Sequence, residues 1–261
     1  KDPRVKFKLD QYIPIILSPR GVMQYVRKDL GVQDVTDIGA KIDAIKSHAI
    51  DKRVFGGKTP TSMGLGLRVA LSLVGVEVKS VWGMKGNGPM ALAFERGEFT
   101  VNFDNSLSFK NNRKKMYEDG LAVPLYTFGV ISDGGKVVRD PAWPDIPTFH
   151  ETYAAVHGKE PAGDEFEAWE ALFHMSVTMS KSLNLPADTP KDVVDAWRNA
   201  ARAILKDPEF IAKRTKIFGD YPQTIGDAAV AIRNKATTIS PGAREYLRKY
   251  LKSRHDVKLN L

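Results

Sequence analysis

The first 150 residues of the chain alternate between two hydrophobic patterns. Short apolar segments typical of strands occur at residues 7–17, 54–55, 76–81, 99–103 and 121–130. Between them, apolar side chains recur at helical spacing over residues 35–48, 65–73 and 90–94. A repeated strand–helix–strand order predicts an α/β sheet with helices against its faces.

The later part of the chain is predicted to be mainly helical. Thr148 is followed three residues later by Glu151, a capping-box pattern that predicts a helix start after the Pro-rich residues 144–147. A similar start is predicted at residues 189–192. One apolar face is then expected to carry Val193, Val194, Trp197, Ala201 and Ile204. Core positions are expected at Phe166, Trp169, Phe173, Met175 and Met179.

Two lysine-bearing turns carry the clearest chemical signal. Residues 54–63 and 82–89 each lead from a strand-type segment, through small residues and one lysine, into a helical pattern. Glycines let the backbone approach closely, a helix start supplies partial positive charge, and Lys58 and Lys85 each supply a full charge. The pattern therefore predicts that both turns grip one anion. The alternative is that they are ordinary strand-to-helix turns. Pro89 is expected at the first helical position after the second turn.

Composition narrows the class of protein. The 261 residues are 43% hydrophobic and 27% charged, which suits one large domain or two lobes with a sizeable core. The chain has no cysteine, which excludes disulfides and thiolate metal sites within it. A formal net charge of +8 favours anionic partners, but the basic residues are spread along the chain. The densest basic cluster, residues 113–115, is followed by Glu118 and Asp119, so we expect no nucleic-acid surface.

The sequence does not fully match any of the catalytic or cofactor-binding motifs that it resembles. Gly57-Lys58-Thr59 resembles the end of a P-loop, but Lys52 stands where that motif needs a glycine. Ser62 lies in a partial nucleophile elbow in which Pro60 replaces the first glycine. The five histidines show no zinc-binding spacing. We therefore expect no catalytic residue, no metal and no cofactor.

Several segments, in order, resemble the substrate-binding proteins of tripartite tricarboxylate transporters, known as the Bug family. The resemblance covers roughly residues 7 to 230. It is carried by residues 56–62, 81–92, 96–98, 103–106, 144–151, 189–194 and 206–209. It implies a two-lobed α/β fold of the type II periplasmic-binding-protein kind, with mixed sheets flanked by helices and a helical C-terminal part.

The same resemblance implies a division into lobes. Residues 16–168 are expected to form a complete α/β lobe that carries the anion-binding turns. Residues 1–15 and 169–261 are expected to form the hinge and the remainder of the other lobe. By comparison with the family, the N-terminal portion of that other lobe is expected to be absent from this sequence.

In function, the resemblance implies an extracytoplasmic receptor that closes on a small organic carboxylate, either a dicarboxylate or an aromatic carboxylate. It would deliver that ligand to the membrane permease of a tripartite transporter without chemical change. We expect a periplasmic monomer whose signal peptide is removed or not shown. Carried over position by position, the ligand contacts are Lys58, Thr59, Thr61, Ser62, Lys85, Gly86, Asn87, Asp104, Asn105 and Ser106.

Two of these positions need comment. Thr61 stands where the family usually has a glycine. Asp104 would repel a neighbouring anion, so it either makes a cap or loop hydrogen bond or meets a hydroxyl or amino group of the ligand.

Two alternatives of other classes stay open. A ligand-sensing domain of a transcription regulator would require a DNA-reading helix upstream. An enzyme acting on a carboxylate or phosphate would require an acid–base pair, and no such pair is recognisable at a familiar spacing.

Overall fold

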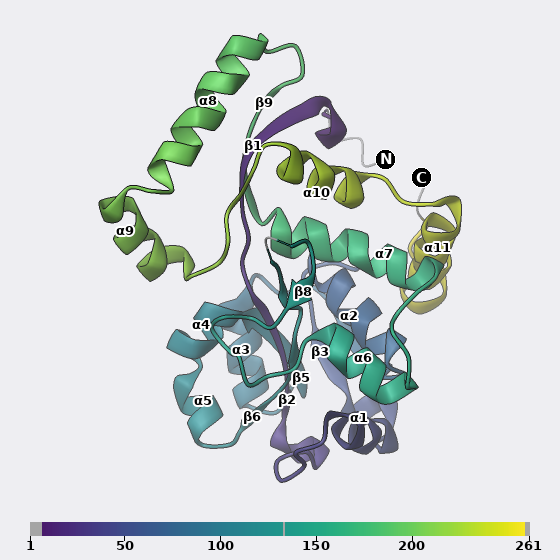
Figure 1. Cartoon of the computed structure of the whole chain (residues 1–261). Helices are drawn as coiled ribbons and strands as arrows, with labels where there is room; N and C mark the ends of the chain where they lie inside the picture. The colour runs from purple at the N-terminus through teal and green to yellow at the C-terminus, as the bar shows by residue number, and fades with distance from the viewer. Residues whose placement is uncertain (1–6, 133, 259–261) are drawn as a thin grey trace.

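The computed structural model describes residues 7–132 and 134–258 and shows two lobes of unequal size (Figure 1). The strand β1 (Tyr12–Ser18) belongs to the smaller lobe, and the chain passes directly from it into β2 (Val22–Arg27) of the larger lobe. The predicted two-lobed α/β fold with mixed sheets is confirmed. The predicted lobe boundaries themselves stay a prediction.

The larger lobe is built on a five-stranded mixed sheet in the order β4-β3-β5-β2-β6. Strand β3 pairs in parallel with β4 and β5, whereas β2 runs antiparallel to β5 and β6. Five of the six β2 residues are buried, as expected for a strand covered on both faces. The other strands are β3 (Val54–Gly56), β4 (Lys79–Val81), β5 (Val101–Asn105) and β6 (Ala122–Thr127).

Helices cover this sheet. They are α1 (Ile38–Ser47), α2 (Gly64–Leu73), α3 (Asn87–Glu95), α4 (Ser106–Asn112), α5 (Lys114–Glu118), α6 (Phe149–His157) and α7 (Asp164–Phe173). The chain then returns at its C-terminal end as α11 (Pro241–His255), which packs along α7 and places Leu251 in the core of the larger lobe. Short 3₁₀ turns lie at Leu9–Gln11, Lys28–Leu30 and Ile50–Lys52.

Aromatic side chains fill the space between α6, α7 and the sheet. The fully buried Trp169 lies 4.3 Å from Phe149 and 5.4 Å from Phe173, measured between ring centroids. The predicted core positions are therefore confirmed for Trp169 and Phe173. The prediction is wrong for Met175, which is 49% exposed.

The smaller lobe is an antiparallel sheet in the order β10-β1-β9, between two helices. Its outer strands are β9 (Lys181–Pro186) and β10 (Thr224–Ile225). One face buries Ile15 against α8 (Lys191–Ile204), and Leu17 lies in a cluster with Ala229 of α10 (Asp227–Thr237). The register with β9 shifts between Pro14 and Ile16, as expected next to a proline, which has no N–H to donate to the neighbouring strand. Helix α9 (Pro208–Phe218) and the hairpin of β7 (Val130–Ile131) and β8 (Val137–Val138) complete the fold.

Three local predictions are corrected. Pro89 is the third residue of α3, not the first; its missing N–H is still harmless there because the first four N–H groups of a helix have no internal partner. The N-cap of α8 is Pro190, and no side chain caps this helix. On α8, Val194 and Ala201 are buried, whereas Trp197 and its neighbours on the predicted face, Val193 and Ile204, are exposed.

No helix within the described ranges combines the length and apolar character needed to cross a membrane.

Candidate functional site

The two lysine-bearing turns lie side by side at one edge of the larger sheet. Gly56 of β3 pairs with Val81 of β4, so the turns leave adjacent parallel strands at their carboxyl ends. The Gly83 N–H donates to the Lys58 carbonyl at 3.2 Å. A Cβ added at Gly57 would come within 2.7 Å of the Trp82 ring, so this close approach requires glycine.

Both lysine side chains of these turns are exposed. Gly86, which precedes α3, has a φ of 145°, a backbone conformation that favours glycine. Thr59 stabilises the first turn, because its carbonyl accepts a hydrogen bond of 2.7 Å from the Ser62 hydroxyl. The two turns are thus neighbours, but neither Lys58 nor Lys85 lines the cavities described below, so their convergence on one anion stays a prediction. Contact of Lys58, Lys85, Thr59 or Gly86 with a ligand stays a prediction.

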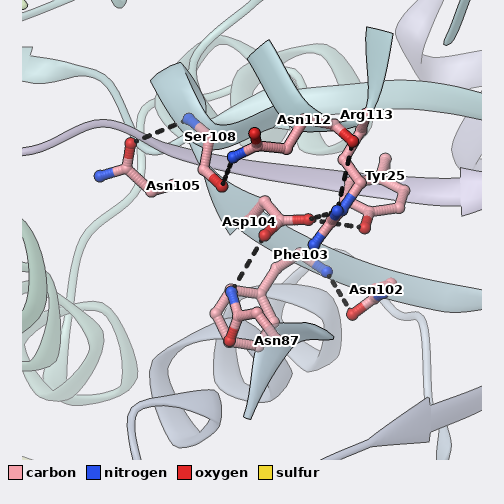
Figure 2. A network of polar contacts seen from close by, with 9 residues as sticks. All are labelled: Tyr25, Asn87, Asn102, Phe103, Asp104, Asn105, Ser108, Asn112 and Arg113. Carbon is pink, nitrogen blue, oxygen red and sulfur yellow. Dashed lines mark hydrogen bonds and ion pairs between the residues drawn. The ribbon is translucent and has the colours of Figure 1, made fainter. Parts of the chain in front are cut away.

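Asp104 lies at the centre of a polar network between the second turn and the sheet (Figure 2). It is 1% exposed, and its Oδ2 accepts hydrogen bonds of 3.0 Å from the Tyr25 hydroxyl and from Nε of Arg113. Its Oδ1 accepts one of 3.1 Å from the side-chain amide of Asn87, the first residue of α3. Burial and the carboxylate of Asp104 raise the pKa of Tyr25 well above its usual value.

This geometry gives Asp104 a structural role, because Arg113 balances its charge and its oxygens fix the start of α3. The network also removes Arg113 from the predicted basic cluster as a free cation. The two lysines that follow it pair with Glu118 and Asp119. Ligand contact by Asp104 or Asn87 stays a prediction.

Asn105 and Ser106 begin helix α4. The Asn105 side chain accepts from the N–H groups of Leu107 and Ser108, at 3.0 and 3.3 Å, and so caps that helix. Ser106 is fully buried, and its N–H donates to the Gly21 carbonyl at 3.2 Å. The Asn105 side chain therefore serves the local fold, whereas the buried Ser106 hydroxyl has no hydrogen-bond partner in the described structure. Contact of either residue with a ligand stays a prediction.

A cavity of about 360 Å³ opens beside the first turn and combines residues that are far apart in the sequence. Two of the predicted residues, Thr61 and Ser62, line it. The other predicted ligand residues do not. Its remaining wall is formed by Arg20, Met63, Gly66, Leu172, Met175, Ser176 and Ser180.

Arg20, which the sequence analysis missed, is the charged group of this cavity. It lies between β1 and β2, is half-buried, and donates from Nε to the Ser176 carbonyl at 3.2 Å. Another guanidinium nitrogen contacts the Met63 sulfur. Burial lowers the pKa of Arg20, and in the described part of the chain no carboxylate opposes that effect. A desolvated cation without a counter-charge is costly, so an anion in the cavity would be stabilised.

A second cation lies close to Arg20. Lys181, the first residue of β9, places its ammonium 5.0 Å from the centroid of the Phe218 ring, at the end of α9. Burial and, after it, the charge of Arg20 lower the pKa of Lys181. The two positive charges therefore repel each other at the junction of the lobes. A ligand with two negative groups would relieve that repulsion.

An irregular helix shapes the remaining wall. Residues His174–Thr178 form a π-helical turn that continues α7, a feature that is frequent at functional sites. This turn brings the exposed Met175 and the half-buried Ser176 to the cavity. No periodic apolar pattern marks such a turn, which explains why Met175 was assigned to the core.

Within residues 7–132 and 134–258, no group of three or more His, Asp and Glu side chains is placed to hold a metal ion.

Comparison with known proteins shows the fold. No family model matches the sequence, and no curated protein does. A solved structure described as R. palustris Rpa4515 with adipate is 20% identical, with a TM-score of 0.56, over 94% of this chain and 69% of that chain. A TctC solute-binding protein from Polaromonas is 15% identical, with a TM-score of 0.58, over 89% of this chain and 69% of that one. The periplasmic binding protein BugD is 17% identical, with a TM-score of 0.52, over 95% and 71%. The chain thus shares the two-lobed fold of TctC-type and Bug-type solute-binding proteins.

Proposed function

We propose that this protein is a solute-binding receptor for a small organic carboxylate, held in the cavity beside the first turn. The observation that carries the proposal is Arg20, a half-buried cation that lines the cavity together with Thr61 and Ser62 and has no carboxylate partner among the described residues. The exposed Lys181 lies outside the cavity lining, but its charge is close enough to Arg20 for the two to repel each other. Such an arrangement is unfavourable when empty and favourable around a negative ligand.

The residues present suggest how the ligand is held. A guanidinium binds a carboxylate with two parallel hydrogen bonds, so Arg20 is the primary anchor. Thr61 supplies a hydroxyl donor, and the start of α2 adds partial positive charge. The Ser62 hydroxyl would have to give up its bond to the Thr59 carbonyl in order to donate to the ligand. Leu172 and Met175 offer an apolar wall to the carbon chain of the ligand.

A dicarboxylate fits this arrangement better than an aromatic monocarboxylate. Lys181 would hold the second carboxylate, which an aromatic acid with one charge lacks. The similar structures point the same way, because one is described with adipate and another, MatC from Rhodopseudomonas palustris, with bound malate. MatC is 16% identical, with a TM-score of 0.50, over 90% of this chain and 71% of that one.

Binding without chemical change is the proposed mechanism. The cavity joins groups of the larger lobe to Arg20 at the lobe junction, so closure of the lobes would enclose the ligand. Delivery to the permease of a tripartite transporter and location in the periplasm belong to the same proposal. They rest on the shared fold.

Calorimetry with the intact protein tests the proposal. We expect adipate and malate to release heat, and Arg20→Gln to weaken binding by about 10- to 150-fold, since hydrogen bonds to charged groups contribute about 1.5–3 kcal/mol. The matched control is Lys159→Gln, an exposed lysine outside the cavity, which should bind like the parent chain. Absence of heat with every di-, tri- and aromatic carboxylate, or unchanged affinity in Arg20→Gln, would overturn the proposal.

A further inference from the structure

A second cavity lies on the outer side of the edge strand β4. Its volume is about 360 Å³, and it is enclosed by β4, by Trp82 just after that strand and by the C-terminal end of α11. It shares no lining residue with the cavity beside the first turn. The proposed carboxylate receptor makes no use of it.

Arg68 is the most unusual residue of this second cavity. It belongs to α2, is 1% exposed, and lies with its guanidinium carbon 4.4 Å from the centroid of the Trp82 ring. Nη2 donates to the Pro60 carbonyl at 2.6 Å, but neither Nε nor Nη1 has a hydrogen-bond partner in the described structure. Burial, partly offset by the nearby Tyr250 hydroxyl, lowers the pKa of Arg68 to about 10, so the side chain still carries its charge at neutral pH.

Two further polar groups without partners line the same cavity. The buried Ser80 hydroxyl on β4 and the buried Nε2 of His255 at the end of α11 make no hydrogen bond within the described residues. A buried polar group without a partner costs about 1–3 kcal/mol, so native structures rarely leave one unexplained. Here three such side chains, from three separate elements, meet around one hollow.

The charges around the hollow are predominantly positive. Lys79 and Arg254 line it together with Arg68, against the single carboxylate of Glu77. That carboxylate already accepts from Arg254, at 2.7 Å, and from the Ser72 hydroxyl, at 2.9 Å. Burial and the charges of Arg68 and Arg254 lower the pKa of His255 to about 4.

We propose that this second cavity binds a small oxyanion, a carboxylate or a phosphate. Its oxygens would accept from Arg68, Ser80 and His255, with Lys79 adding charge from the strand. An anion would accept from Arg68, from Ser80 and from Nε2 of His255 in its Nε2–H form, and it would offset the positive charge around the hollow. Arg68 also contacts Pro60 of the first turn and Trp82 of the second, so occupancy of this cavity would stiffen both turns.

His255 provides a local reporter for the test. Its imidazole C–H signal is followed by NMR as a function of pH in the intact protein, and His255→Gln assigns that signal. Inorganic phosphate and acetate are added separately, and sodium chloride at equal ionic strength is the control. An opposite charge within about 4–6 Å shifts a pKa by about 1–3 units, so we expect an anion to raise the pKa of His255 by about one unit or more.

The separate titrations with phosphate and with acetate distinguish the two kinds of anion. A rise with phosphate alone supports a phosphate ligand, and a rise with acetate alone supports a carboxylate. No rise with either anion would overturn the proposal.

Variants of the lining residues test whether the anion binds in this cavity. Ser80→Ala and Lys79→Gln should each weaken the titrated affinity by about fivefold, a change of about 1 kcal/mol. Lys159→Gln and Arg20→Gln should leave it unchanged, so failure here is independent of the carboxylate-receptor proposal. A shift of His255 that survives both Ser80→Ala and Lys79→Gln would place the anion elsewhere and overturn the proposal.

Discussion

Gly21 shows how a single residue sets the junction between the lobes. Asp140 and Tyr221 surround it together with Ser106; Tyr221 lies between α9 and β10, and the Tyr221 hydroxyl donates to Oδ1 of Asp140 at 3.0 Å. An added Cβ at Gly21 would lie 1.9 Å from Oδ2 of Asp140 and 2.3 Å from the Ser106 hydroxyl. Because the three side chains are buried, they have no room to move aside.

We expect Gly21→Ala to lower the free energy of unfolding by about 1–3 kcal/mol, the usual cost of overpacking a filled interior. Urea denaturation followed by circular dichroism measures the change. Gly88→Ala is the matched control, since nothing lies within 4 Å of an added Cβ at Gly88. Equal stability of the two variants would show that the junction can rearrange around Gly21.

At the scale of elements, helix starts separate what local sequence determines from what it does not. Thr148 and Glu151 make both bonds of a capping box, with the Glu151 N–H donating to the Thr148 hydroxyl at 3.1 Å. Thr189 has the same chemistry two residues before α8, yet Pro190 takes the N-cap position and no side chain caps the helix. A threonine close to a helix start therefore caps α6 but does not cap α8.

This difference predicts unequal effects of two similar substitutions. Thr148→Ala should cost about 1 kcal/mol of unfolding free energy, the typical effect of removing a capping side chain. Thr189→Ala should change stability by less than about 0.5 kcal/mol, as for surface positions without a special role. Urea midpoints of the two variants, measured side by side, provide the check. A comparable loss in Thr189→Ala would mean that Thr189 caps α8 in solution.

Elements were predictable wherever one periodic pattern sufficed. The strands β1, β3, β4, β5 and β6, the helices α1 and α2, and the turns after β3 and β4 followed from spacing and from glycine chemistry. The strands β2, β9 and β10 were not predicted. The buried face of α8 could not be predicted in this way. The smaller lobe buries only Val194 and Ala201 of the expected apolar face and leaves Trp197 exposed. Helical periodicity identifies an amphipathic helix, but tertiary contacts decide which side is covered.

At the scale of the whole molecule, the candidate cavity joins parts of the chain that no local pattern relates. Arg20, Ser62 and Ser176 meet only because β1 passes between the lobes and because a π-helical turn extends α7. The lysine, hydroxyls and glycines of the first turn were enough to predict an anion site there, which stays a prediction. The sequence could not identify Arg20, an isolated basic residue in a chain with many.

The lobe junction also makes the stability of the molecule depend on pH. Burial raises the pKa of Asp140 in the folded protein, and its Oδ2 has no hydrogen-bond partner in the described structure. A carboxyl whose folded pKa lies above its unfolded value binds more protons when folded. Its contribution therefore favours folding at low pH and is lost as the pH rises from the unfolded pKa, near 3.8, through the folded pKa.

Asp140→Asn should remove that dependence while keeping the Oδ1 acceptor for Tyr221 and for the Ala142 N–H. We expect the variant to be at least as stable as the parent chain at neutral pH, because it replaces a desolvated charge with a neutral amide. Its advantage should shrink as the pH falls through the raised pKa of the folded protein, because the parent carboxyl then becomes protonated. Urea unfolding of both proteins between pH 4 and 8 measures the difference, and Asp119→Asn, at an exposed position, is the control. A variant that is less stable at neutral pH would mean that Asp140 is ionised and held by donors at the closed junction, so that its charge helps to keep the two lobes together.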